Sequence, residues 1–193
     1  MERARRADAE RNREAIVEAG IRLLAGDSRA SMAEIAAAAG VSRVTMYGHF
    51  ASRKDLVGAV FSRVMDESRT TLEGVDLSGD EMAALERLVL ASWRIVGPGR
   101  VLLAAAREEL GADGVRDRHE DAARRLETLV RRGRASGAFR TDVPTAWLVT
   151  CYQATLHTAA DELLAGRLAE RSADRIVLAT IRSLFAAPAS SGS

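Results

Sequence analysis

Apolar residues recur every three or four positions along most of the chain, and no stretch alternates apolar with polar residues as a half-buried strand does. The first run, over residues 16–24, has the stripe of an amphipathic helix. A shorter run over residues 32–39 follows a capping box, in which Ser31 precedes Glu34 by three positions, and it stops at Gly40. The pattern therefore predicts an all-α protein.

A third short helix is expected directly after this glycine. Ser42 is suited to cap it, and Met46 and Phe50 lie one turn apart, so we expect both to point inward. The outward face then consists of Arg43, Val44, Tyr47 and Gly48. Two short helices joined by a tight turn, the second with hydrogen-bonding groups on its outward face, indicate a helix-turn-helix.

Longer helices are predicted downstream. Ser52 with Asp55 is typical of a helix start, and the helix that it opens links the helix-turn-helix to the rest of the chain. A second capping box is predicted at Ser78 with Glu81. The helix that follows it is expected to end at the Gly-Pro-Gly of residues 97–99.

The remaining pattern predicts a polar loop and then two strongly apolar helices. Residues 111–125 are expected to form a loop and the exposed start of a helix, and Pro144 is expected in the first turn of a helix through Leu164. Apolar residues lie on nearly all sides of that helix. In the last helix, from Ile176 to Phe185, they also occupy more than one face. Either both are central core helices or, as we favour, they form a homodimer interface shared by two subunits.

Composition narrows the class of protein. The formal net charge of +1 over 193 residues excludes a histone-like electrostatic coat, so any DNA contact must be local. The single cysteine, Cys151, excludes an internal disulfide, and neither a secretory signal nor a run long enough to span a membrane is present. We therefore expect a cytoplasmic protein without a membrane partner. The only lysine, Lys54, is a compact charge suited to a phosphate oxygen.

The run I-A-A-A-A-G-V-S-R-V-T-M-Y-G-H-F-A-S-R-K-D-L, within residues 13–60, resembles the DNA-binding domain of the TetR family of bacterial transcriptional regulators. The resemblance implies an all-α protein with an N-terminal three-helix helix-turn-helix DNA-binding domain joined to a six-helix ligand-binding and dimerisation domain. On this basis we expect a flexible arm at residues 1–9, the helix-turn-helix domain at 10–55, the effector-binding and dimerisation domain at 56–187 and a disordered tail at 188–193.

Eight residues are expected to contact DNA: Ser42, Arg43, Val44, Thr45, Tyr47, Gly48, His49 and Lys54. Arg43 can bond a guanine and Val44 can touch a thymine methyl, whereas Thr45, Tyr47, His49 and Lys54 are expected to hold phosphates. The alternative for Tyr47 is a core aromatic packed on the first helix, and for His49 a solvated surface histidine. Gly48 departs from the bulkier residue common in the family.

Candidate chemistry in the C-terminal part is sparse. The residues expected to line an effector pocket are Trp93, Trp147, Cys151, Tyr152, His157 and Asp161. His157 and Asp161 lie one helical turn apart. Either they form a polar pair that lines the pocket, or His157 is a core histidine whose hydrogen bonds are satisfied within the protein. Two such ligands do not make a metal site, and we expect no metal and no cofactor.

The expected function is that of a ligand-responsive DNA-binding transcriptional regulator. In the favoured form it is a repressor that a small-molecule effector, of unknown identity, releases from a palindromic operator on double-stranded DNA. An activator or a nucleoid-type DNA binder is the alternative. An enzyme built on His157 and Asp161 is disfavoured, because no nucleophile, phosphate-loop or metal motif accompanies the pair.

Overall fold

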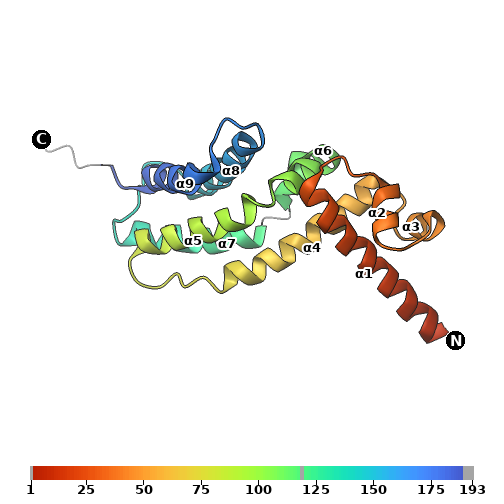
Figure 1. Ribbon diagram of the computed structural model, residues 1–193. Helices are drawn as coiled ribbons and strands as arrows, with labels where there is room; N and C mark the ends of the chain where they lie inside the picture. Colours follow the sequence, from red (N-terminus) through yellow and green to blue (C-terminus); the bar gives the residue numbers. More distant parts are fainter. Residues whose placement is uncertain (1, 118–119, 189–193) are drawn as a thin grey trace, which may run out of the picture. The chain divides into compact units, whose positions relative to one another are not determined.

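The structure is a computed structural model that describes residues 2–117 and 120–188. Across these residues the chain is helical throughout, apart from its connections and one isolated bridge between Phe139 and Ala186 (Figure 1). The helices are α1 (Glu2–Gly26), α2 (Met32–Ala38), α3 (Arg43–His49), α4 (Arg53–Glu73), α5 (Glu81–Val96), α6 (Arg100–Asp117), α7 (Glu120–Ala135), α8 (Thr145–Leu164) and α9 (Glu170–Phe185). The predicted all-α class is confirmed.

The helices form two compact units. The first contains the described residues of Met1–Glu67 and Val101–Arg118, and the second those of Ser68–Arg100 and His119–Ser193. The long helix α4 therefore contributes to both units. Helix α6, apart from Arg100, belongs to the first unit, although it follows α3 by some fifty positions in the sequence.

The first unit has α1, α2 and α3 packed on one another, with the N-terminal part of α4 against α1. Its core consists of fully buried apolar side chains from each of these helices, Ile16, Leu24, Ile35, Met46 and Leu56. The backbones of α1 and α4 approach closely at Gly20, where an added Cβ would lie 2.6 Å from Cγ2 of Val60. A larger residue at this crossing would push the two helices apart.

The predicted ends of the short helices are confirmed. The hydroxyl of Ser31 accepts the Glu34 N–H at 3.2 Å, while the Glu34 carboxylate accepts the Ser31 N–H at 2.7 Å. The bonds that the Ser31 N–H and hydroxyl donate to the charged carboxylate lower the pKa of Glu34. Gly40 then takes a φ of +69°, the left-handed conformation that stops α2 and turns the chain into α3.

The second unit packs α5, α7, α8 and α9 around one apolar core, and α8 and α9 run side by side in Figure 1. Phe139, from the connection between α7 and α8, lies in this core with its ring edge-on to Phe185 at 5.7 Å between centroids. The ring sits directly against Gly133 of α7, where no Cβ fits. Glycine is therefore required at this contact.

The predicted capping box at Ser78 is wrong. Helix α5 begins at Glu81 with Asp80 as its N-cap, and the Asp80 carboxylate accepts the Ala83 N–H at 2.7 Å. Gly79, with a φ of +77°, turns the chain so that Asp80 rather than Ser78 reaches the cap position. Both residue types cap helices, so sequence spacing alone did not decide between them.

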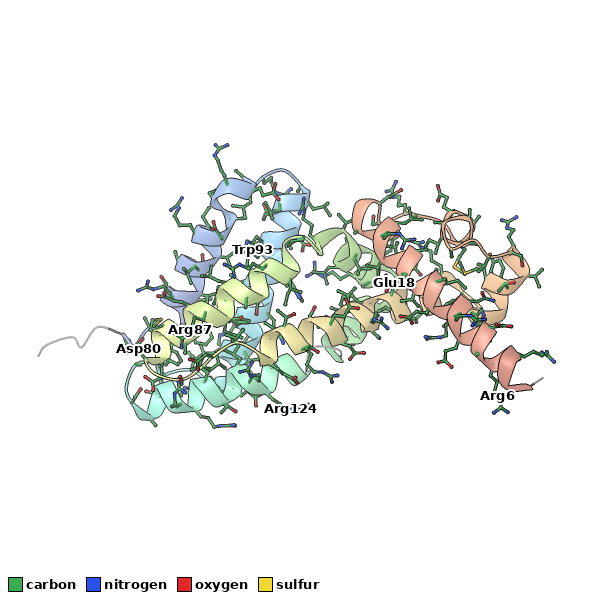
Figure 2. All side chains as sticks on the ribbon, turned by 60° about the horizontal axis from the view of Figure 1, so that its bottom comes forward. Arg6, Glu18, Asp80, Arg87, Trp93 and Arg124 are labelled. Carbon is green, nitrogen blue, oxygen red and sulfur yellow. The ribbon has the colours of Figure 1, made fainter. Side chains whose placement is uncertain are left out.

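Arginines hold the loop between α4 and α5. Arg87 of α5 donates its Nε to the Asp76 carbonyl and its Nη2 to the Ser78 carbonyl, both at 2.7 Å. Figure 2 shows Arg87 and Asp80 at the same end of α5. From α7, Arg125 donates to the Leu72 carbonyl and, at 2.9 Å, to that of Val75. These guanidinium groups bond carbonyls of the last turn of α4 and of the loop that follows it, and so fix the path of the loop.

The predicted loop over 111–125 is also wrong in its first part. Helix α6 breaks at Gly111, with φ 74° and ψ 174°, and then resumes as far as Asp117, while α7 begins at Glu120. Residues 118–119 lie outside the described residues. A mostly polar, solvated helix gives no apolar period, which is why the pattern indicated a loop. Pro144 is the N-cap of α8 rather than a residue of its first turn.

The N-terminal residues expected in the arm have helical backbone from Glu2, as part of α1. Arg11 pairs with Asp8 one turn before it, a contact that supports helix in a charged, exposed segment. Arg6 lies at this end of α1 (Figure 2). Residue 1 and residues 189–193, which belong to the predicted arm and tail, lie outside the described residues.

A membrane-spanning helix needs about 20 consecutive, mostly apolar residues. No single helix within residues 2–117 and 120–188 is long and apolar enough to cross a membrane; only residues 81–96 and 100–115, taken together as a bent pair, reach that length and composition.

Candidate nucleic-acid interface

Helix α3 has a buried face and an exposed face. Met46, on the inner face, is 1 % exposed, whereas Val44 is 84 % and Tyr47 53 % exposed. Arg43 and Gly48 are exposed beside them. The predicted orientation of the helix is confirmed, and the exposure of Tyr47 rules out the alternative of a core aromatic. Two large apolar side chains on one exposed face are typical of a contact surface.

The start of α3 is fixed by its cap. The Ser42 hydroxyl accepts the Thr45 N–H at 3.1 Å and lies 2.9 Å from the Thr45 hydroxyl. The two hydroxyls are therefore hydrogen-bonded to each other at the N-terminus of α3, where the unpaired backbone N–H groups make the electrostatic potential positive. Arg43 directly follows the cap and forms no ion pair within the described part of the chain.

The other candidates lie around this helix. His49 is half-buried in the last turn of α3, and Lys54 is exposed in the first turn of α4. An added Cβ at Gly48 would meet nothing within 4 Å, so this position is open to solvent. The structure thus brings all eight predicted DNA-contact residues onto α3 and its flanks. Whether they touch DNA stays a prediction.

Arg53, in the first turn of α4, is a residue that the sequence reasoning missed. Its guanidinium donates to the carbonyls of Ser28 and Ala30, in the α1–α2 connection, and its Nε lies 2.8 Å from the Glu109 carboxylate of α6. The side chains of Arg53 and Glu109 are both half-buried. One arginine therefore ties the segment before α2 to α6 within the first unit. Its carboxylate partner is 56 positions away, a separation at which no local pattern signals a contact.

Replacing Arg53 with glutamine is expected to lower the free energy of unfolding by about 1–3 kcal/mol, because two carbonyls and a half-buried carboxylate lose their donor. Urea titration of the two proteins measures the change. Arg63→Gln, on the same helix, is the matched control: its pairs with Glu14 and Glu67 are exposed, so it should lower the free energy of unfolding much less than Arg53→Gln does. Equal losses from both variants would contradict the role given to Arg53.

The predicted effector residues are dispersed over the second unit. Trp93 and Tyr152 are buried in its core, Trp147 is 57 % exposed, and His157 and Asp161 are half-buried on α8. Consecutive residues of a helix point about 100° apart, which separates Cys151 from Tyr152. The groove between α8 and α9 is lined by Cys151 and by none of the other five, and the assignment of the six residues to a pocket stays a prediction.

Tyr152 has a defined partner set in the core. Its hydroxyl donates to the Ser92 hydroxyl at 2.8 Å and lies 3.2 Å from the Leu88 carbonyl, which joins α8 to α5. Burial raises the pKa of Tyr152 above that of a free phenol, so the hydroxyl remains a neutral donor.

The Tyr152→Phe variant is expected to unfold with a free energy about 1–3 kcal/mol lower than the wild type, because it leaves the buried Ser92 hydroxyl without this partner. Thermal and urea unfolding measure the loss. Tyr47→Phe removes the same hydroxyl from an exposed tyrosine and should leave stability within about 0.5 kcal/mol. An unchanged midpoint for Tyr152→Phe would show that the buried bond contributes nothing.

An apolar groove of about 590 Å³ runs between α8 and α9. Cys151, Ala154 and Thr158 line it from α8, and Ile176 and Leu184 from α9. Ile176 is itself exposed, although it is a large apolar residue. The last two helices therefore bury one face in the unit and leave a second apolar face open.

Residues 16–60 span the C-terminal part of α1, all of α2 and α3, and the start of α4. They match the family model described as "Bacterial regulatory proteins, tetR family". This segment is therefore similar to the DNA-binding segment of the TetR family, and it carries the helix-turn-helix of such regulators.

Two comparisons extend beyond the family segment. The HTH-type transcriptional repressor LfrR of Mycolicibacterium smegmatis (strain ATCC 700084 / mc(2)155) is 37 % identical over 89 residues, which are 46 % of this chain and 47 % of LfrR. The match thus spans about half the length of this curated relative. The crystal structure of the TetR-like regulator LfrR from Mycobacterium smegmatis in complex with proflavine shares 25 % identity at a TM-score of 0.68, covering 91 % of this chain and 96 % of LfrR.

More distant solved structures share the fold. A TetR-family regulator from Agrobacterium tumefaciens is 17 % identical with a TM-score of 0.71, covering 92 % of this chain and 99 % of that protein. A TetR-family regulator from Marinobacter aquaeolei VT8 is 23 % identical with a TM-score of 0.65, covering 94 % and 98 %. At these identities the likeness concerns the fold alone.

Proposed function

We propose that this protein is a transcriptional regulator of the TetR family, a repressor that binds a palindromic operator through the exposed face of α3 and leaves it when a small molecule binds the second unit. The observation that carries the proposal is the pairing of a buried Met46 with an exposed Arg43, Val44 and Tyr47 on one short, capped helix. A helix held on one face and bare on the other is what insertion into a major groove requires.

The exposed residues divide into two roles. Arg43 offers a planar fork to the O6 and N7 atoms of guanine, and Val44 offers a methyl surface to thymine, so these two specify the sequence. Thr45, Tyr47, His49 and Lys54 hold backbone phosphates and fix the register. Ser42 positions the helix start, and Gly48 leaves room for the backbone to approach the duplex closely.

A homodimer supplies the second recognition helix. The apolar groove between α8 and α9 supports this, because a second copy would cover it together with the exposed Ile176 in a four-helix bundle. Two α3 helices about 34–36 Å apart would then enter successive major grooves of a near-palindrome.

The effector is a small molecule bound in the second unit, with Trp93, Trp147, Cys151, Tyr152, His157 and Asp161 as candidate contacts. Binding changes operator affinity only as far as the ligand prefers one conformation of the protein, and a coupling of about 1–3 kcal/mol corresponds to a five- to 150-fold loss of affinity. The solved complex of LfrR with proflavine makes that dye the first compound to test.

The test measures the binding of a labelled operator duplex to the protein by fluorescence anisotropy. The binding of proflavine and of a panel of other compounds to the protein is measured separately by calorimetry. We expect at least one compound that binds the protein to lower operator affinity by fivefold or more, in the range of a coupling of about 1–3 kcal/mol. Compounds that bind the protein and leave operator occupancy unchanged would contradict the release mechanism, while operator binding itself would still stand.

A further inference from the structure

We infer that Arg13 of α1 is a further phosphate-contact residue, which extends the proposed DNA interface from α3 and α4 onto the first helix. The inference rests on the proposed function and deepens it. Its basis is a groove in the first unit that brings Arg13 beside His49 and Lys54, two of the side chains assigned to the DNA backbone.

The groove is open and polar, with a volume of about 640 Å³. Arg13 lines it from α1, His49 and Phe50 from the end of α3, and Lys54 from the first turn of α4. Residues from both sides of the helix-turn-helix therefore converge on one surface depression. Since Lys54 and His49 flank the exposed face of α3, a duplex seated on α3 would pass over this groove.

Three basic side chains of the groove are available to a ligand. Arg13, His49 and Lys54 make no ion pair within the part of the chain that the structure describes. The groove's fourth basic residue, Arg63, is already engaged with Glu14 and Glu67, each at 2.7–2.8 Å. The charges of Arg13 and Lys54, with the His49 imidazole as a further hydrogen-bonding group, form a site for a backbone phosphate.

The acidic groups of the groove are engaged within the protein. The Asp55 carboxylate accepts the Ser52 hydroxyl at 2.7 Å, in the cap of α4. Asp66 also lines the groove and has a partner of its own. Neither carboxylate forms an ion pair with Arg13 or Lys54, so the N–H groups of these two side chains remain open to an anion.

Phe50 holds the guanidinium of Arg13 in place. The Arg13 Cζ lies 5.4 Å from the centroid of the Phe50 ring, and Phe50 is buried at the C-cap of α3. A cation over an aromatic face is restrained without using its N–H groups, and no side-chain hydrogen bond of Arg13 occurs within the described residues. The fork is therefore positioned and still free to bond two phosphate oxygens.

Arg22 provides the matched control. It is an exposed arginine of the same helix, and nine positions at about 100° each place it on the opposite side of α1 from Arg13. The Arg22→Gln variant removes an equal charge from the chain and hence the same long-range attraction. Any difference between the two variants reports the local contact.

The experiment measures the dependence of duplex affinity on salt concentration by anisotropy for the wild type and for Arg13→Gln, Arg13→Met and Arg22→Gln. Methionine retains apolar packing on Phe50 without the charge, so one neutral variant remains if the other does not fold. Melting temperatures are recorded for each protein, and a selection from random duplexes gives their base preference.

We expect both neutral Arg13 variants to bind every duplex more weakly, with a salt slope smaller by about one for each protomer and an unchanged base preference. Arg22→Gln should keep the wild-type slope. If the Arg13 variants keep the wild-type salt slope, with or without a lower melting temperature, the role of Arg13 is limited to packing on Phe50. That result would overturn the inference about Arg13 and leave the proposed function standing. A wild type that binds no duplex would overturn the proposed function as well.

Discussion

Replacing Arg43 with alanine is expected to relax base preference at one position of each operator half-site, by about 1–3 kcal/mol between the preferred base and its competitors. The reason is that the exposed guanidinium at the start of α3 is the side chain best placed to bond a guanine edge. Lys54→Ala, by contrast, should weaken all duplexes alike and lower the salt slope by about one, because a phosphate contact carries no sequence information.

Selection from a random duplex pool, followed by salt titration of the selected site, separates the two effects. The pair of variants serves as its own control, since each removes one positive charge from the same surface. Equal losses of base preference from Arg43→Ala and Lys54→Ala would contradict the division of roles between specifying and positioning residues.

Gly133→Ala is expected to destabilise the second unit by about 1–3 kcal/mol, as overpacking of a tightly filled core does. An added Cβ would lie far inside van der Waals contact with the Phe139 ring, which is itself fully buried and packed on Phe185. The ring cannot move aside without displacing its neighbours in the core. Urea unfolding of the variant measures the change.

The same substitution in an open helix position should act in the opposite direction. Gly48→Ala, in α3, places its Cβ where nothing lies within 4 Å, so it is expected to stabilise the protein by up to about 1 kcal/mol through the better helix propensity of alanine. A Gly133→Ala protein as stable as Gly48→Ala would show that the core around Phe139 adapts to the extra methyl group.

Local signals predicted the fold of the first unit well. The Ser31–Glu34 capping box, the left-handed Gly40 and the Ser42 cap are each decided by residues within four positions, and all three were confirmed. The inward side of α3 also followed from spacing, because Met46 and Phe50 lie one turn apart. Features that depend on neighbours in sequence were therefore accessible without coordinates.

Features that depend on distant partners were not. No pattern in the sequence pairs Arg53 with Glu109, or Arg125 with the carbonyls at the end of α4, since these contacts join segments more than fifty positions apart. The choice of Asp80 over Ser78 as a cap depended on the turn at Gly79. The segment after Gly111 was predicted as loop because a mostly polar helix shows no apolar stripe.

The candidate effector residues illustrate the same limit. Aromatic and polar side chains on α5 and α8 were chosen by type, but residue type does not give the direction in which a side chain points. Trp147 is exposed, and the Tyr152 hydroxyl is occupied by Ser92 and the Leu88 carbonyl in the core. By contrast, the predicted DNA contacts belong to one seven-residue helix and its flanks, where the helical period alone orients them.

The claim on which the account depends is that the exposed face of α3 reads duplex DNA. Its most direct test is selection by the wild-type protein from a pool of random duplexes at low ionic strength. We predict enrichment of a near-palindrome whose half-sites are centred about 10–10.5 base pairs apart, as two recognition helices on one dimer require. A pool that emerges without any preferred sequence, or no duplex retained at all, would contradict the account.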